Sequence, residues 1–94
     1  MIDPEVSVRI AGGRTRVLVQ LRVDGADEGR RAEEIARVQD AVLSRLPQSH
    51  ASLTRRYTSV AILALEIDAT ALRALETMSG EVSAIKPDHL KRPR

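Results

Sequence analysis

The sequence predicts an α+β fold, a ferredoxin-like split βαβ sandwich with a four-stranded antiparallel sheet and two helices on one face. Two observations lead to this fold class. The hydrophobic spacing alternates between a period of two and a helical period, in the order strand, helix, strand, strand, helix, strand. A chain of 94 residues is also the right length for one small domain of this kind.

Residues 1–13 stand apart from this pattern. They contain Pro4 and the pair Gly12 and Gly13, so we expect a loose lead-in that can hold a short turn of helix. The domain proper is expected to cover residues 14–87, and residues 88–94 to form an extended tail. The segment 15–23 begins the sheet, because Val17, Val19, Leu21 and Val23 alternate with Arg16, Leu18, Gln20 and Arg22.

The first helix is predicted over residues 30–46. Ile35, Val38, Val42 and Leu46 recur at intervals of three or four, with charged residues between them. Asp27 is the expected N-cap, and Pro47 ends the helix.

A hairpin and a second helix follow. Residues 50–57 are expected to form a polar strand and residues 60–67 an apolar one, joined by Thr58 and Ser59. Asp68 is the expected N-cap of a helix over residues 69–79, and Gly80 is placed for a left-handed C-terminal cap. Residues 81–87 form the last strand, which Pro87 closes.

The apolar strand 60–67 predicts a second, exposed patch. Ala61, Leu63, Leu65 and Ile67 can face the helices, which leaves Val60, Ile62 and Ala64 on the other side together with Leu18 and Gln20 of the first strand. We expect these five residues to form a docking face for a partner. The alternative is ordinary aliphatic surface on a central strand.

Composition argues against several other classes of protein. The absence of Cys excludes disulfides and thiolate metal sites. Tyr57 is the only aromatic residue, so the base-stacking strands of RNA-binding modules cannot form. Neither histidine, His50 or His89, belongs to a catalytic motif. We therefore expect no enzyme activity, metal, cofactor, nucleic acid or membrane partner. The start of the chain also lacks the pattern of a signal peptide.

The pattern from Tyr57 onward resembles a known family. The run YTSVAILALEIDATALRALETMSGEVSAIKPDHLKRP is similar to the second half of the subtilisin propeptide family, the inhibitor I9 family. Its features are a tyrosine, an apolar strand, an acid before a short Leu-rich helix, and an Asp-His pair before the tail. The runs TRVLVQLRV and RRAEEIARVQDAVLSRL resemble the first strand and the long helix of that family, so the likeness covers residues 14–94.

The resemblance implies a propeptide-like inhibitor and intramolecular chaperone of a subtilisin-like serine protease. Such a domain lays the outer face of its sheet on the protease and places its tail in the active-site cleft. It is a monomer when free, a heterodimer with the protease, and secreted or extracellular as part of a protease precursor. The tail residues would be Asp88, His89, Leu90, Lys91, Arg92, Pro93 and Arg94.

Two positions depart from the family pattern. Lys86 stands where the family often has a second acid, so the role of accepting hydrogen bonds from a protease helix rests on Asp88. Lys91 stands where subtilisins usually prefer an apolar side chain, and Leu90 can be the apolar anchor instead.

Two alternatives stay open. The tail can be a solvated terminus that keeps the domain soluble. The domain can also be a small-ligand regulatory domain of similar topology, which binds an amino acid and dimerises through its sheet. Against the first alternative, Pro87 and Pro93 favour an extended backbone at Lys86 and Arg92, which lowers the entropy lost on binding.

Overall fold

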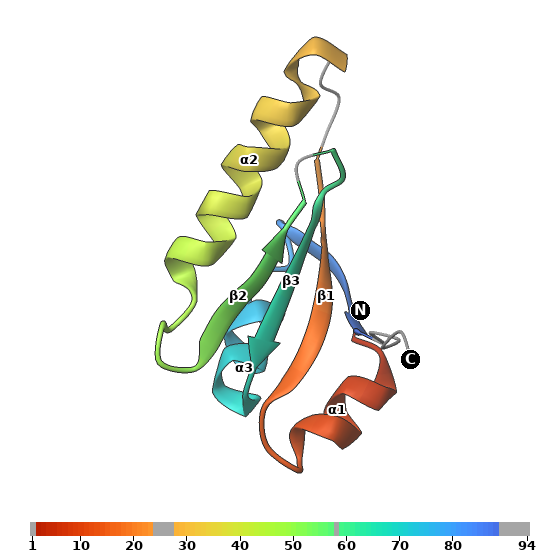
Figure 1. Ribbon diagram of the computed structural model, residues 1–94, viewed down its shortest axis with the longest axis vertical. Helices are drawn as coiled ribbons and strands as arrows, with labels where there is room; N and C mark the ends of the chain where they lie inside the picture. Colours follow the sequence, from red (N-terminus) through yellow and green to blue (C-terminus); the bar gives the residue numbers. More distant parts are fainter. Residues whose placement is uncertain (1, 24–27, 58, 89–94) are drawn as a thin grey trace, which may run out of the picture.

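The computed structural model describes residues 2–23, 28–57 and 59–88 (Figure 1). It has the predicted α+β fold, with one helix more than expected. In chain order the elements are α1 (Pro4–Ile10), β1 (Thr15–Leu21), α2 (Glu28–Arg45), β2 (Ala51–Arg56), β3 (Ile62–Ile67), α3 (Ala69–Glu76) and β4 (Val82–Pro87). None of the helices in these ranges has the length and apolar character needed to span a membrane.

The four strands form one antiparallel sheet in the order β2-β3-β1-β4. This order is compatible with the predicted split βαβ sandwich, because each helical crossover places a strand away from its predecessor. The helix α3 lies behind the strands in Figure 1, and α2 runs along the β2 side of the sheet. The opposite face, called the outer face below, is the one turned toward the viewer.

The core lies between the sheet and the helices. Val17 and Val19 of β1 are fully buried, as are Leu63 and Leu65 of β3, which confirms the predicted alternation of these strands. Val42 of α2 and Leu46, which follows this helix, join the same cluster, and α3 adds Ala71, Leu72 and Leu75. The predicted N-cap of α2, Asp27, lies outside the described residues. Aliphatic packing between the helices and the sheet therefore holds the fold together.

The N-terminal segment is not the loose lead-in that its composition suggested. Pro4 begins the helix α1, and the Asp3 carboxylate caps it by accepting a 2.9 Å hydrogen bond from the Glu5 N–H. Before the helix, the Asp3 N–H donates to the Ile85 carbonyl at 2.9 Å, so this segment pairs with the edge strand β4. Val6 is fully buried in the core.

Sequence reasoning allowed a short turn of helix in this segment but missed the packing of α1, because a helix this short gains most of its stability from tertiary contacts. Val6→Ala is therefore expected to lower the free energy of unfolding by about 2 kcal/mol, through lost apolar burial and a small cavity. Val8 is 74% exposed on the same helix, so Val8→Ala is the matched control and should change stability by less than about 0.5 kcal/mol. Urea unfolding measures both, and equal effects would contradict the packing of α1.

The hairpin and the second helix agree with the sequence in type and differ at their ends. Strands β2 and β3 pair as an antiparallel hairpin, but Val60 and Ala61 belong to the connection. Asp68 is the N-cap of α3, as predicted, and accepts a 3.0 Å hydrogen bond from the Ala71 N–H. The prediction of a left-handed C-terminal cap at Gly80 was wrong. The helix ends at Thr77 in a right-handed conformation, and Gly80 follows within further turns, without a positive φ.

The acidity of Asp68 leads to a pH prediction. The Ala71 N–H bond, aided by His50, whose Nδ1 lies 2.5 Å from the carboxylate, holds the pKa of Asp68 below its usual range. The charged carboxylate therefore stabilises the fold above the pKa of the unfolded chain, and this contribution is lost as the pH falls through the lowered folded pKa. Asp68→Ala should destabilise the protein at neutral pH and progressively less below about pH 4. Urea midpoints at several pH values measure this, with the exposed Glu33→Ala as control; a deficit that does not change with pH would contradict it.

Candidate docking face

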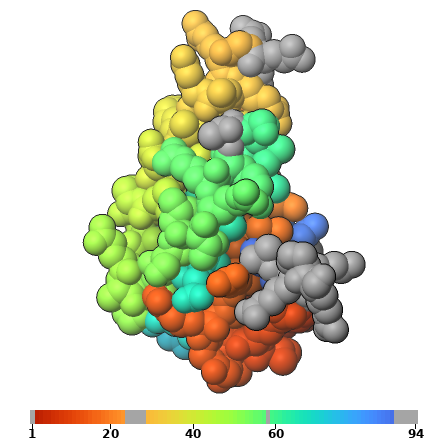
Figure 2. Space-filling model, in the orientation of Figure 1, coloured from red at the N-terminus to blue at the C-terminus, as the bar shows by residue number. Residues whose placement is uncertain are grey.

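The outer face is a grid of side chains from all four strands. In the sheet register Arg55 lies opposite Ala64, Ala64 opposite Leu18, and Leu18 opposite Lys86. The neighbouring rows contain Arg16 opposite Glu66, and Ile62 opposite Gln20, which faces Ala84. Figure 2 views this face, on which side chains of β2 (green) and β1 (orange) reach the surface.

The structure places the five expected docking residues in three different settings. Leu18, Gln20 and Ile62 lie on the outer face and are half-buried. Val60 is 41% exposed in the connection before β3, and Ala64 is only 2% exposed. The accessible aliphatic surface therefore comes from Leu18, Ile62 and Val60, and Ala64 contributes almost none of it.

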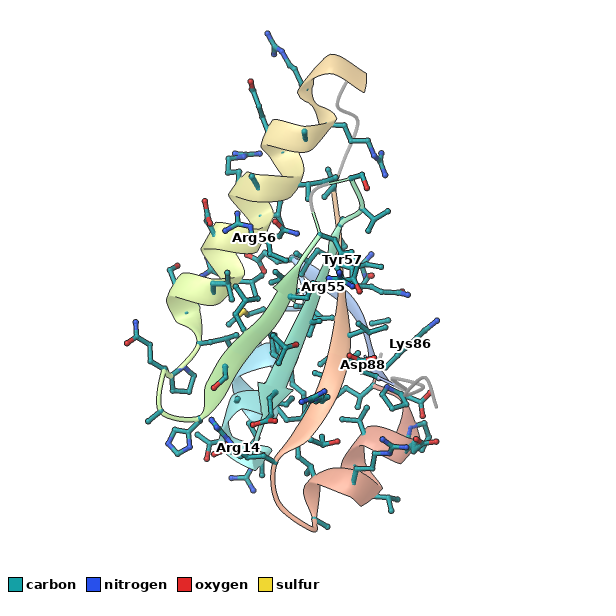
Figure 3. All side chains as sticks on the ribbon, viewed as in Figure 1. Arg14, Arg55, Arg56, Tyr57, Lys86 and Asp88 are labelled. Atoms are coloured by element: carbon teal, nitrogen blue, oxygen red, sulfur yellow. The ribbon has the colours of Figure 1, made fainter. Side chains whose placement is uncertain are left out.

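Ala64 instead lies at the base of a hollow in the outer face. This hollow has a volume of about 310 Å³ and is lined by Arg16, Thr54, Arg55, Tyr57, Ala64 and Asp88. The short Ala64 side chain leaves room between longer neighbours on the pleated surface, and those neighbours account for its low exposure. Figure 3 shows Arg55 and Tyr57 close together near one end of β2, and Asp88 at the end of β4.

A β-bulge places Arg55 on this face. Leu53 pairs with Leu65 and Arg55 with Ala64, and the register shifts between the two pairs. Without the shift, strict alternation from Leu53 would point Arg55 toward the helices. Arg56 points there instead: its Nε donates to Gln39 Oε1 at 2.8 Å.

Gln39 of α2 fixes the connection that precedes β3. This side chain is 1% exposed, and its Nε2 donates to the Tyr57 carbonyl at 2.7 Å and to the Ile62 carbonyl at 3.1 Å. A buried amide is tolerable only when its polar atoms have partners, which these bonds provide. Sequence reasoning missed the role of Gln39. The available signal was a polar residue on the same helix face as the apolar Ile35 and Val42, which indicates a buried side chain with hydrogen-bond partners.

The charges of the outer face are mostly positive. The Arg16 Nε lies 3.9 Å from Glu66, which Arg14 also approaches at 3.7 Å, so neither contact is a tight ion pair. The Arg55 guanidinium lies 5.6 Å from the centroid of the Tyr57 ring. Within residues 2–23, 28–57 and 59–88, no carboxylate forms a salt bridge with Arg55 or Lys86. Arg22, which follows β1, donates from its Nε to the Ser79 carbonyl at 3.3 Å.

The chain leaves the sheet beside the hollow. The Asp88 N–H donates to the Arg16 carbonyl at 3.0 Å, which continues the pairing of β4 with β1 beyond Pro87. The other expected tail residues, His89, Leu90, Lys91, Arg92, Pro93 and Arg94, lie outside the described part of the chain. His50, which precedes β2, pairs with Asp68 at the start of α3 and does not line the hollow.

Comparisons with known proteins found no relative of this chain. No family model, no curated protein and no solved structure matches this chain. The likeness to subtilisin propeptides therefore rests on the residues quoted above, and function must be argued from the outer face and the end of β4.

Proposed function

We propose that this chain is a propeptide-like inhibitor and folding assistant of a subtilisin-like serine protease, without catalytic activity of its own. The observation that carries the proposal is the outer face of the sheet, which α2 and α3 leave uncovered and from whose rim the chain continues into its tail. A face of this kind can dock on a protein surface while the adjoining segment enters a cleft.

The aliphatic side chains supply the area that docking needs. Leu18 and Ile62 are partly accessible in the middle of the sheet, and Val60 extends this area from the connection before β3. Burial of apolar surface is the main favourable contribution in most protein associations. The polar side chains around it, including Gln20 and Lys86, form a hydrated rim.

The folding role follows from binding thermodynamics. A domain that binds the folded protease, and does not bind its unfolded chain, stabilises the folded form in proportion to its affinity and concentration. Joined to the protease in one precursor, the domain would act at a high effective concentration. We place this precursor outside the cell and the free domain in a one-to-one complex with its protease.

A substitution in the centre of the outer face tests the docking step. Ile62→Glu should raise the inhibition constant for a subtilisin-like protease by about tenfold or more, because a carboxylate would be buried against the protease without a partner. Val8→Glu introduces the same charge at an exposed position of α1, outside the strands that form this face, and should leave inhibition unchanged. Circular dichroism checks that both variants fold. Equal potency of Ile62→Glu and the unsubstituted chain would contradict docking through this face.

A small-ligand regulatory domain is the second candidate. It is favoured by the oppositely charged groups of the hollow, since Arg16 and Asp88 match the carboxylate and the ammonium group of a free amino acid. A ligand that binds only the folded state raises the melting temperature, so a thermal-shift screen with amino acids separates the two proposals. The inhibitor proposal expects no shift with about 0.1 mM amino acid, and a saturable shift with one amino acid at that concentration would favour the regulatory domain.

A further inference from the structure

The hollow on the outer face has features that a simple aliphatic docking patch does not need. Its lining includes two arginines, Arg16 and Arg55, together with the small residue Ala64. Among the described residues, Asp88 is the one carboxylate in the lining of this hollow of about 310 Å³, so the two guanidinium groups leave one positive charge unbalanced there. This arrangement points to a negatively charged group supplied by a partner.

Arg55 is already held in a suitable position. Its guanidinium lies 5.6 Å from the centroid of the Tyr57 ring, and Gln39 fixes the Tyr57 backbone by donating to its carbonyl. A guanidinium beside an aromatic ring keeps N–H groups available for a planar carboxylate. Less side-chain entropy is then lost when an anion binds. Arg16, whose contact with Glu66 is loose at 3.9 Å, can turn toward the same anion.

On these grounds we propose that the hollow is a subsite for an acidic side chain of the docked partner, a carboxylate held between Arg16 and Arg55. The identity of that partner as a subtilisin-like protease rests on the proposed function, whereas the carboxylate specificity rests on the hollow alone. The protease surface that faces the hollow should accordingly carry an Asp or a Glu. Lys86, exposed on the same face, adds to the attraction.

Asp88 indicates a protein rather than a nucleic acid as the source of the anion. It lines the hollow together with the arginines, and its carboxylate has oxygens that can accept further hydrogen bonds from a partner. A peptide segment offers main-chain N–H donors next to an acidic side chain. A phosphodiester backbone brings only acceptors and repeated negative charge, which Asp88 would repel.

Nuclear magnetic resonance of the full chain tests the subsite directly, with backbone amide shifts as the signal. The probes are two capped tripeptides, acetyl-Ala-Glu-Ala-amide and acetyl-Ala-Gln-Ala-amide. The Glu peptide should shift the amides of Arg16, Arg55 and Asp88 in a saturable manner, with a dissociation constant on the order of millimolar. The Gln peptide should bind at least about fivefold more weakly than the Glu peptide, because its side chain carries no charge. Equal binding of the two peptides, or shifts centred elsewhere, would overturn the proposal.

Variants separate the hollow from the general charge of the face. Ala64→Leu fills the base of the hollow and should abolish binding of the Glu peptide, while Ala84→Leu adds the same group outside the hollow and should preserve it. Arg55→Gln leaves Ala64 unchanged and should weaken binding of the Glu peptide by about fivefold. This variant tests the subsite even if Ala64→Leu does not fold. Retained binding in Arg55→Gln would contradict the subsite.

Two further probes identify the source of the anion. Free glutamate binding more tightly than the Glu peptide would assign the hollow to a small ligand, and a single-stranded oligouridylate binding more tightly would assign it to nucleic acid; either result overturns the proposal. Saturable binding of the Glu peptide by a chain that inhibits no subtilisin-like protease would preserve the subsite and reject only the proposed function.

Discussion

A chain that ends at Asp88 is expected to lose at least about a hundredfold in potency as an inhibitor of a subtilisin-like protease, equivalent to about 3 kcal/mol of binding free energy. In the proposed complex the residues after Asp88 occupy the cleft, where an extended peptide gains main-chain hydrogen bonds and fills pockets with alternate side chains. Steady-state inhibition of the protease by the intact and shortened chains measures the difference.

The shortened chain keeps every described element of the fold, up to Asp88, whose N–H donates to the Arg16 carbonyl. The matched control keeps the length of the tail and replaces residues 89–94 by glycine and serine. It should be as weak as the shortened chain, since a flexible tail loses more entropy on binding and lacks the side chains. If both versions inhibit as strongly as the intact chain, the tail has no part in inhibition.

Gln39→Leu is expected to destabilise the free domain by about 3 kcal/mol, because the carbonyls of Tyr57 and Ile62 and the Arg56 Nε lose their partner together. The loss is large for a domain of this size, whose total stability is only about 5–14 kcal/mol. The shape of the hollow should change as well, since Tyr57, which lines it, loses the hydrogen bond that fixes its backbone. Urea unfolding at neutral pH measures the change.

The exposed Gln48→Leu is the matched control for Gln39→Leu and should change the free energy of unfolding by less than about 0.5 kcal/mol. A second variant, Gln39→Met, has nearly the shape of glutamine without its hydrogen bonds, so it separates lost bonds from misfit. Wild-type stability in Gln39→Met would show that the buried bonds contribute nothing.

The sheet and its two covering helices were predictable because each strand shows a hydrophobic period of two and each of these helices a period of three to four residues. Alternation placed Val17 and Val19 inside, and the spacing of Ile35 and Val42 predicted the buried stripe of α2. The helix α1 was not predictable in this way, since burial of Val6 and pairing of Asp3 with Ile85 stabilise it only in the folded state.

The positions of the outer-face residues were predicted in part, and the hollow was not. Period-two reasoning placed Leu18, Ile62 and Ala64 on the correct side of the sheet. It could not reveal the bulge that turns Arg55 outward, because a register shift depends on how two strands pair and leaves no mark in one strand's pattern. The alternation within one strand also does not show which side chains of neighbouring strands lie beside Ala64. The low exposure of Ala64 was therefore found only in the structure.

The most direct test of the central claim is inhibition of a panel of subtilisin-like serine proteases by the intact chain, with trypsin-like proteases as the comparison class. We predict competitive inhibition of at least one subtilisin-like member, with an inhibition constant of about micromolar or below, and none of the trypsin-like enzymes. Failure to slow any subtilisin-like member, or equal inhibition of both classes, would contradict the proposal that this sheet face and tail recognise a subtilisin-like protease.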